Sequence, residues 1–410
     1  MKKNVYIVSL FCVFAHNLFT QSADLRIHGS LRKIDIPFEY SNDFIILNIV
    51  FNDYLPLKFI FDTGSEHTIL AKREITDLLQ VNYQRRFTLL GADMSSEVYA
   101  YLVRGVSLRL NDKITALNRS ILVLEEDYLH FEELAGLEIH GIIGSDIFRR
   151  FVVKIDYNRK IITLYEPNSF EAPGGNYDRL PIEISRHKPY VNFNVRLQND
   201  TLLNLKLLLD TGASLALLLH TNTHPDLKLP DQVIPSNLGA GLGGYIQGFM
   251  GRVEDLDLGD TELHSIITHF QEIGMNRDSV YAASRNGIIG NKILDRYTII
   301  IDYIRQVAYL EPNGKFSQKF EYDKSGLSLI SYGLSLNKFR VFSVLPGSPA
   351  AEAGLQKDDD IKTVNGWPAS LWDLASLNAK FKKKAGKKIT LKVLRNGEKL
   401  KFTFYLRDLI

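Results

Sequence analysis

Cysteine is almost absent from this sequence of 410 residues, because Cys12 is the only one. It lies in an N-terminal segment that starts with Lys2 and Lys3 and continues as an apolar run over residues 5–15. A positive start followed by an apolar run too short to span a bilayer well is typical of a secretory signal. We therefore expect residues 1–22 to be a signal peptide and the mature protein to be exported, either periplasmic or extracellular.

Removal of this segment would leave a mature chain without cysteine, which excludes disulfides, a thiolate nucleophile and cysteine metal ligands. The residues before Cys12 are Leu10 and Phe11 rather than small residues, which argues against a lipoprotein anchor. A buried N-terminal strand and an uncleaved anchor are the alternative interpretations of the segment.

The sequence also lacks an excess of charge of either sign, with 49 Lys and Arg against 47 Asp and Glu. Its net charge of +2 gives no reason to expect nucleic acid or an acidic membrane as a partner. Neither a P-loop nor a G-x-S-x-G motif is present, and no other apolar run is long enough for a stable membrane span. The lysine-rich residues 380–388 are most simply a solvated helix end.

What the sequence does contain is an internal repeat. An apolar run that ends in Asp-Thr-Gly occurs at residues 59–65 and again at 207–213, so that Asp62 and Asp210 stand 148 residues apart. Five further landmarks recur in the same order at nearly the same separation. They are Gly91-Ala92 with Gly239-Ala240, Arg104 with Arg252, Gly141-Ile142-Ile143-Gly144 with Gly287-Ile288-Ile289-Gly290, Ile155-Asp156-Tyr157 with Ile301-Asp302-Tyr303, and Glu166-Pro167 with Glu311-Pro312. The two halves are therefore interpreted as duplicated domains.

Short apolar or alternating runs dominate each half and predict β-strands. In the first half we expect strands over residues 44–51, 57–61, 151–155 and 160–165. Short helices are expected at residues 146–150 and 292–296, after each Gly-Ile-Ile-Gly. An acidic stretch over residues 125–138 is a further helix candidate. The Pro- and Gly-containing residues 172–176 are predicted to link the halves.

A carboxylate at the end of a buried strand is costly unless it has a partner or a chemical role. Two such carboxylates brought together can share one proton, because like charges in contact cannot both ionise. Asp62 and Asp210 are therefore candidates for a pair that activates water. A lone Asp-Thr-Gly would be no more than a turn, but two copies in matching contexts are specific.

Asp-Thr-Gly after an apolar strand, followed later by an apolar-Gly segment, resembles the aspartic proteases of the pepsin and retropepsin clan. The resemblance covers roughly residues 26–316 and implies two fused retropepsin-like β-barrel lobes, over residues 26–172 and 177–316. It implies Asp62 and Asp210 as the catalytic pair, acting without cofactor or metal on a peptide or protein substrate. The lobes would be related by a pseudo-twofold axis in a monomer.

The resemblance also assigns a supporting role to the residues that follow each aspartate: Thr63, Gly64, Ser65, Thr211, Gly212 and Ala213. The threonines would bond across the two loops, and the glycines would let the backbone approach the carboxylates. The Ser65 hydroxyl could donate to its carboxylate, whereas Ala213 could not. The Gly-Ile-Ile-Gly segments would pack beside these loops as support, and an ordinary strand end predicts nearly the same.

A glycine-rich stretch, residues 239–244, satisfies the G-x-G-x-x-G pattern. A dinucleotide site needs a strand before the pattern and a helix after it, and the glycine-rich residues that follow do not favour a helix. By the repeat, this stretch corresponds to residues 91–101, where the family has its β-hairpin flap over the cleft. The flap candidates are Gly91, Gly239, Gly241, Gly243 and Gly244. A plain flexible loop is the alternative.

The pattern changes after Pro312. Residues 348–354 predict a short helix with a Ser cap and a Gly stop, residues 371–384 an amphipathic helix, and residues 389–394 and 400–406 a hairpin through Asn396-Gly397.

This third region resembles a PDZ domain of the bacterial type over residues 324–410. The resemblance rests on Ser348-Pro349-Ala350 before Ala353-Gly354-Leu355, then Asp359-Asp360-Ile361 and Val364-Asn365-Gly366. It departs from the pattern at Asp358, where such domains usually have Gly. A PDZ groove takes an extended peptide as an added strand, so a C-terminal peptide is a possible ligand. The candidate carboxylate-binding loop is Ser325, Gly326, Leu327 and Ser328. The alternative is that the domain only packs on the protease.

His220 and His224 have the i, i+4 spacing of some zinc sites, but no third ligand is evident, and surface histidines are the expected outcome. The sequence thus predicts a mainly β chain: an exported aspartic endopeptidase with a C-terminal α+β PDZ domain. Two rivals stay open, a peptide-binding protein that has lost activity and a PDZ-directed scaffold with structural barrels.

Overall fold

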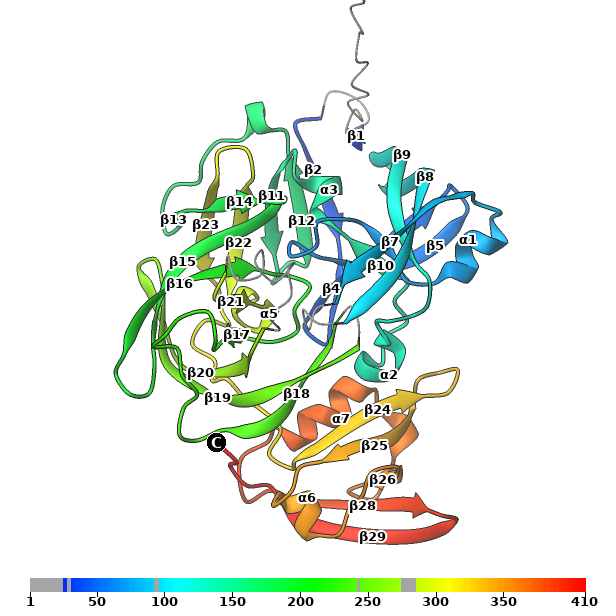
Figure 1. Ribbon diagram of the computed structural model, residues 1–410, viewed down its shortest axis with the longest axis vertical. Helices are drawn as coiled ribbons and strands as arrows, with labels where there is room; N and C mark the ends of the chain where they lie inside the picture. The colour runs from blue at the N-terminus through cyan, green and yellow to red at the C-terminus, as the bar shows by residue number, and fades with distance from the viewer. Residues whose placement is uncertain (1–24, 28–30, 92–95, 242–243, 274–284) are drawn as a thin grey trace, which may run out of the picture.

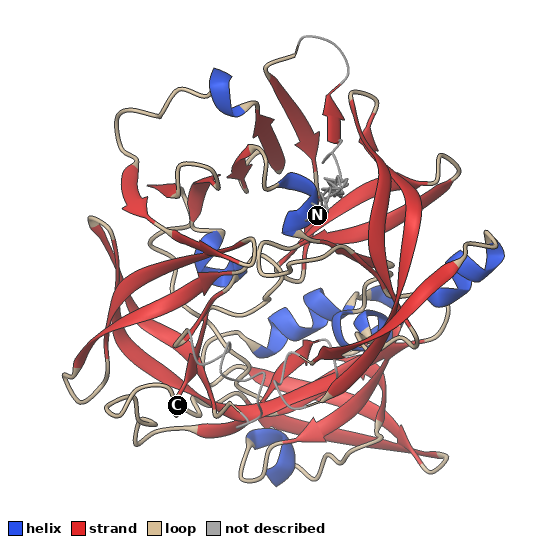
Figure 2. Cartoon of the chain, turned by 45° about the horizontal axis from the view of Figure 1, so that its top comes forward, coloured by secondary structure: helices blue, strands red, loops and turns tan. Residues whose placement is uncertain are grey.

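The computed structural model describes residues 25–27, 31–91, 96–241, 244–273 and 285–410. The expected signal peptide therefore lies outside the described residues. Strands dominate and helices are short, as Figure 2 shows. None of the helices in the described ranges is both long and apolar enough to cross a bilayer.

The first lobe is a nine-stranded sheet with the order β1-β9-β6-β10-β5-β4-β8-β7, in which β3 also pairs with β4. A further pairing between β8 and β9 closes most of the sheet into a barrel. Its strands are β1 (Leu25–Ile27), β3 (Glu39–Ser41), β4 (Phe44–Phe51), β5 (Leu55–Phe61), β6 (Ile69–Leu70), β7 (Tyr83–Leu90), β8 (Glu97–Asn111), β9 (Ile114–Leu124) and β10 (Gly141–Ile143). Its helices are α1 (Arg73–Leu78), α2 (Phe131–Ala135) and α3 (Ser145–Phe148).

The second lobe repeats this plan with the order β14-β15-β16-β21-β17-β20-β19-β18, closed by a pairing between β15 and β19. Its strands are β14 (Glu183–Ser185), β15 (Lys188–Arg196), β16 (Leu202–Leu209), β17 (Leu217–His220), β18 (Ile234–Gly241), β19 (Gly244–Leu258), β20 (Thr261–Gln271) and β21 (Gly287–Ile289). One helix, α5 (Asn291–Leu294), follows β21. The expectation of two duplicated β-barrel lobes is confirmed.

A six-stranded sheet joins the lobes in the order β13-β23-β22-β11-β12-β2. At its centre β11 of the first half pairs antiparallel with β22 of the second, which relates the halves by an approximate twofold axis. The strands are β2 (Lys33–Pro37), β11 (Val152–Asp156), β12 (Ile161–Tyr165), β13 (Asp178–Pro181), β22 (Tyr297–Asp302) and β23 (Val307–Pro312), and a 3-10 turn, η1 (Pro167–Ser169), follows β12.

The C-terminal domain is a separate sheet with the order β24-β25-β26-β28-β29, in which β27 pairs with β26. Its strands are β24 (Leu327–Tyr332), β25 (Lys338–Val344), β26 (Asp360–Val364), β27 (Trp367–Pro368), β28 (Lys388–Arg395) and β29 (Glu398–Tyr405). Its helices are α6 (Pro349–Glu352), η2 (Ala369–Leu371) and α7 (Leu374–Phe381). In Figure 1 this domain lies below α2 and the β18–β19 hairpin.

The strands form because their apolar side chains alternate or run continuously, and the barrels bury them. One core of buried residues extends through both lobes and the joining sheet, and the C-terminal domain has its own core around Phe339 and Phe381. Each fully buried aliphatic or aromatic side chain contributes about 1.5–3 kcal/mol. The strands β5 and β16, which lead into the two aspartates, lie inside the common core, so the backbone before each aspartate is held by close packing.

Two local expectations are corrected. The helix expected over residues 371–384 is shorter, because Asp373 caps it and accepts from the Ser376 amide, so that α7 starts at Leu374. The acidic stretch 125–138 is helical only over α2. Asp358, where the sequence departs from the usual Gly, has φ +71°, the left-handed conformation that favours Gly.

Candidate active site

Each of the two aspartates stands at the end of a strand that is fixed by a parallel neighbour. The Asp62 amide donates to the Ile143 carbonyl at 3.0 Å, and the Asp210 amide donates to the Ile289 carbonyl at 2.9 Å. These bonds continue the parallel pairings of β5 with β10 and of β16 with β21. The Gly-Ile-Ile-Gly segments therefore hold the aspartate loops.

Two threonines brace the loops against each other. The Thr63 hydroxyl donates to the Leu209 carbonyl at 2.7 Å, and the Thr211 hydroxyl donates to the Phe61 carbonyl at 2.8 Å. Each hydroxyl also accepts the amide of the opposite threonine at 3.0 Å. Both threonines are fully buried, so these four bonds are shielded from water.

The two carboxyl groups meet at the centre of the molecule, and a hydrogen bond links Asp62 with Asp210. Glycine is required beside them. A Cβ on Gly64 would lie 2.4 Å from Cγ of Asp210, and a Cβ on Gly212 would lie 2.3 Å from Cγ of Asp62. Side chains at these positions would force the carboxyl groups apart.

The pKa of Asp62 lies well above its ordinary value, first because of burial and then because of the neighbouring Asp210 carboxylate. The pair therefore holds a proton at pH values at which an isolated aspartate is ionised. Both residues nevertheless keep part of their surface accessible, so water and a ligand can reach them.

The donors to the two carboxylates differ, but not in the predicted way. Oδ1 of Asp62 accepts the amides of Gly64 and Ser65 at 2.7 and 3.0 Å, whereas Oδ1 of Asp210 accepts the Gly212 amide at 2.8 Å. The Ser65 hydroxyl instead donates to the His67 carbonyl at 2.8 Å. The expected bond from this hydroxyl to the carboxylate is therefore wrong.

Sequence reasoning missed Asn291, which follows the second Gly-Ile-Ile-Gly and is fully buried. Its amide nitrogen donates to the carbonyls of Thr211 and Asp43 at 2.6 and 2.7 Å, and its oxygen accepts the Tyr157 hydroxyl at 2.6 Å. Asn291 thus connects one aspartate loop to the opposite lobe. The sequence feature that could have identified Asn291 is its position directly after the second Gly-Ile-Ile-Gly.

The flap candidates lie in two β-hairpins. Gly91 follows β7, and its amide donates to the Ser96 carbonyl at 2.7 Å. Gly239 and Gly241 belong to β18, where Gly241 pairs with Gly244 of β19. Gly243 lies outside the described residues. The hairpins agree with the expected flap shape, and their role as flaps stays a prediction.

The proposed carboxylate-binding loop of the PDZ domain is already occupied by a side chain of the same chain. Oδ1 of Asp323 accepts the amides of Ser325 and Gly326 at 2.9 and 2.7 Å and the Ser325 hydroxyl at 2.8 Å. The Leu327 amide donates to the Ser325 hydroxyl at 3.1 Å. Three of the four candidate amides therefore have side-chain partners within the chain, and Ser328 pairs with Ser343 in the β24–β25 ladder.

The two histidines considered for zinc do not form a site. His220 is fully buried at the end of β17, which corrects the expectation of a surface residue, and burial lowers its pKa to about 3. His224 is half-buried, and its Nδ1 accepts the Asp226 amide at 3.2 Å.

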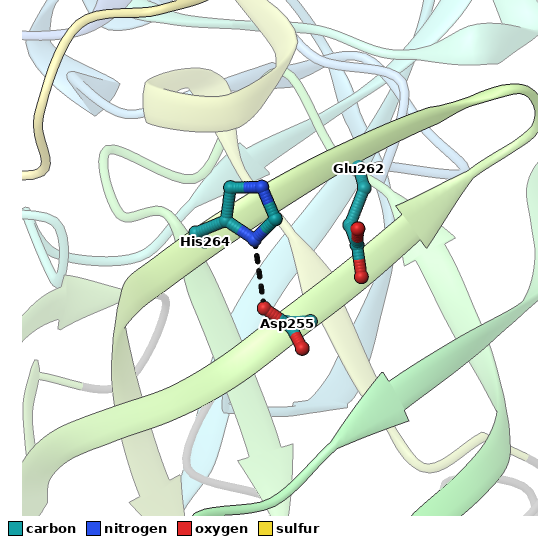
Figure 3. A group of neighbouring side chains, drawn as sticks. All are labelled: Asp255, Glu262 and His264. Atoms are coloured by element: carbon teal, nitrogen blue, oxygen red, sulfur yellow. Dashed lines mark hydrogen bonds and ion pairs between the residues drawn. The ribbon is translucent and has the colours of Figure 1, made fainter.

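Among the described residues, one group has the spacing of metal ligands: Asp255, Glu262 and His264 on the β19–β20 hairpin (Figure 3). It lies largely at the surface, and Asp255 is already engaged by His264 at 2.8 Å and by Arg196 at 3.3 Å. These partners satisfy the carboxylate, so the group supports no metal assignment.

Two family models match separate parts of this chain. Residues 47–147 match the family model described as aspartyl protease, and residues 319–406 match the model described as PDZ domain. A crystal structure of an aspartic proteinase from Irpex lacteus covers 70% of this chain and 99% of its own, with 12% identity and a TM-score of 0.42. A search of curated proteins found no match.

The chain thus contains an aspartyl protease domain and a C-terminal PDZ domain on a mainly β fold. The aspartyl protease model matches residues 47–147 of the first lobe, and the second lobe repeats the topology of the first.

Proposed function

We propose that this protein is an exported aspartic endopeptidase that hydrolyses peptide bonds with a water activated by Asp62 and Asp210. The observation that carries the proposal is the contact between these two carboxyl groups, each delivered by an Asp-Thr-Gly loop of a different lobe. A paired, partly protonated dyad is suited to general acid–base catalysis.

In this mechanism the ionised carboxylate takes a proton from the water, and the protonated carboxyl polarises the peptide carbonyl. The raised pKa of Asp62 lets the pair keep this proton at pH values at which an isolated aspartate has lost it. The amides of Gly64, Ser65 and Gly212 hold the carboxyl groups in place while the proton moves.

The test is cleavage of a peptide library by the chain without residues 1–22, with and without an aspartic-protease inhibitor. Inhibitor-sensitive cleavage supports the proposal. Absence of cleavage over pH 3–8, with the inhibitor still bound by the folded protein, would instead favour a peptide-binding protein without activity.

We further propose that the PDZ domain docks peptides or substrates beside the protease. A cavity of about 920 Å³ lies between the two, lined by Gly326 and Ser328 on the PDZ side and by Ile234 and Gln247 of the β18–β19 hairpin on the protease side. Because β24 is the edge strand of the PDZ sheet, an added peptide strand could pair with it. The test is a titration with peptides that have free or amidated C-termini. Binding is followed by the fluorescence of Trp372, which lies just before α7.

Export rests on the sequence pattern of residues 1–22 alone. N-terminal sequencing of the protein from its native host should find a chain that begins at roughly residues 20–25. An intact Met1 on protein inside the cell would contradict export.

A further inference from the structure

Strand register identifies equivalent positions in the two lobes beside the aspartates. In the first lobe Ser41 pairs with Phe44, and in the second lobe Ser185 pairs with Lys188. In each lobe the turn between the two paired residues consists of two residues in the left-handed conformation, so Phe44 and Lys188 occupy equivalent positions. The same registers make Ile46 equivalent to Tyr190. On the next strand Ile46 pairs with Ile60 and Tyr190 pairs with Leu208, and each of these partners stands two residues before the aspartate of its lobe.

Two further matches come from the segments that support the loops. Leu70 pairs with Gly141 and Leu219 pairs with Gly287, which makes Ala71 equivalent to His220. The backbone confirms this, because the Ala71 and His220 amides each donate at 2.8 Å to the residue before the respective glycine. Ile139 and Arg285 are then equivalent, since each stands two residues before its glycine.

In the first lobe all four positions are apolar. Phe44, Ile46, Ala71 and Ile139 are buried in one hydrophobic cluster, which Phe131 of α2 also joins. The rings of Phe44 and Phe131 meet edge to face at 5.6 Å. This lobe shows that the fold fills the positions beside the aspartate without any charge.

In the second lobe the same four positions hold Lys188, Tyr190, His220 and Arg285. Tyr190 and His220 are buried, and Lys188 and Arg285 are partly buried. The four positions therefore form an apolar patch in the first lobe and a polar, cationic patch in the second lobe.

This patch lacks a nearby salt-bridge partner. The side chain of Arg285 is hydrogen-bonded to Tyr190, but within the described residues neither Lys188 nor Arg285 forms a salt bridge, and Nε of Arg285 and both ring nitrogens of His220 have no hydrogen-bond partner. Partly buried cations without a salt bridge and unsatisfied polar atoms are costly, and an anion would satisfy them. The patch is close to the dyad, since the positive charge of Lys188 lowers the pKa of Asp62 against the larger effects of burial and Asp210.

We propose that Lys188 and Arg285 form a subsite that selects an acidic side chain of the peptide substrate on the second-lobe side of the dyad. The inference rests on the proposed endopeptidase function and adds the substrate class: peptides with Asp or Glu near the scissile bond on one side.

The test uses peptide pairs that differ by Glu against Gln at one position, scanned across the scissile bond. At one position on one side of the bond we expect kcat/KM to favour Glu by about tenfold or more, the scale of a hydrogen bond to a charged group. Lys188→Met and Arg285→Gln should each bring this ratio toward one. Lys58→Met is the matched control, because Lys58 of the first lobe is exposed and bonded to Glu39 at 3.0 Å.

Binding of the same peptides to the Asp210→Asn chain separates the inference from the proposed function. Preferential binding of the Glu peptide without cleavage by the unaltered chain would support the subsite and count against the protease. A Glu to Gln ratio near one at every position would overturn the subsite, with the protease intact. The subsite would also be overturned if Lys188→Met shifted the pH profile for both peptides equally and preserved their ratio, because the charge would then act only on the dyad.

Discussion

At the scale of single residues, the pair Asp62 and Asp210 is the least replaceable feature of the molecule. Each carboxyl group lies against the glycine of the opposite loop, where no larger residue would fit. The pair is also a cost to the fold, because burial and repulsion raise the pKa of Asp62.

Asp62→Asn and Asp210→Asn should each abolish peptide cleavage, since an amide can neither take the proton from water nor protonate the carbonyl. The losses should not add in the double variant, because the two residues act as a unit. Asn is nearly isosteric, and removal of one of two close charges should leave the melting temperature at pH 7 unchanged or raise it. Near-normal turnover by either variant would contradict the shared-proton mechanism.

The threonine brace gives a second prediction. Thr211→Val should destabilise the chain by about 2–4 kcal/mol, because it leaves the Thr63 amide and the Phe61 carbonyl without partners in a buried site. Thr211→Ser keeps the hydroxyl and is the matched control, with an expected loss below about 1.5 kcal/mol. Denaturant unfolding of both variants measures the difference. Equal stability of the two variants would contradict the dominant role assigned to the hydroxyl at this position.

The aspartates could be predicted from sequence because their motif is local and repeated. Lys188, Arg285 and His220 could not, because their burial depends on strand registers that bring distant segments together. An i, i+4 histidine pair on an unknown fold is most often at the surface, and the strand ending at His220 places it in the interior instead.

At the scale of elements, the PDZ loop shows how a side chain can replace a ligand. Asp323 satisfies the loop amides, and burial raises its pKa from 3.8 to about 6 in spite of these bonds. The folded chain therefore binds this proton more tightly than the unfolded chain. The residue's contribution to stability is largest below about pH 4 and falls as the pH rises through about 6.

Asp323→Asn should keep the acceptor and remove this pH dependence, which we expect to be about 1–3 kcal/mol between pH 4 and 7. Asp323→Ala should leave two loop amides unsatisfied and cost about 2–3 kcal/mol at any pH. Hydrogen exchange at the Ser325 and Gly326 amides reads the loop directly: protection should survive in the Asn variant and fall in the Ala variant. Protection that is unchanged in the Ala variant would refute the bonding scheme.

The turn at Asp358 gives a smaller effect. A non-glycine residue at φ +71° carries a strain of about 1 kcal/mol, and the Asp358 amide donates to the Val341 carbonyl at 2.8 Å in this conformation. Asp358→Gly should therefore raise stability by up to about 1 kcal/mol, and Asp358→Ala should not. Thermal unfolding of the two variants checks this, and a loss with Gly would mean that the carboxylate has a partner of its own.

Elements were predictable where pattern and length agree, as for β4 and for the hairpin of β28 and β29, whose turn residues Asn396 and Gly397 both adopt positive φ. The lengths of the helices were less predictable from the sequence. The amphipathic pattern of residues 371–384 continues past Phe381, but Lys383 and Lys384 at that end are exposed and add no buried contact to hold another turn.

At the scale of the whole molecule, the PDZ domain is packed on the protease rather than loosely linked to it. Tyr322, just before the domain, belongs to the protease core, and Leu409 and Ile410, at the C-terminal end of the domain, pack against that core. The Tyr322 hydroxyl accepts the Leu409 amide at 2.7 Å and the Ile410 amide at 3.2 Å. On the other side, β24 lies beside α2 (Figure 1), and the Ser331 hydroxyl of β24 donates to the Glu132 carbonyl of α2.

Deletion of residues 324–410 should leave cleavage of short peptides in place, because the dyad and its brace come entirely from the two lobes. It should change the selection of protein substrates, since the cavity beside the β18–β19 hairpin loses its PDZ wall. The deletion should also lower the melting temperature, because Leu409 and Ile410 leave the core.

A chain that lacks only Leu409 and Ile410 is the matched control for this deletion: it should share the lower melting temperature but keep the protein-substrate pattern. Assays of both chains on one short peptide and one unfolded protein decide the matter. Loss of short-peptide cleavage in the large deletion but not in the control would show that the PDZ domain completes the catalytic site, contrary to the arrangement described here.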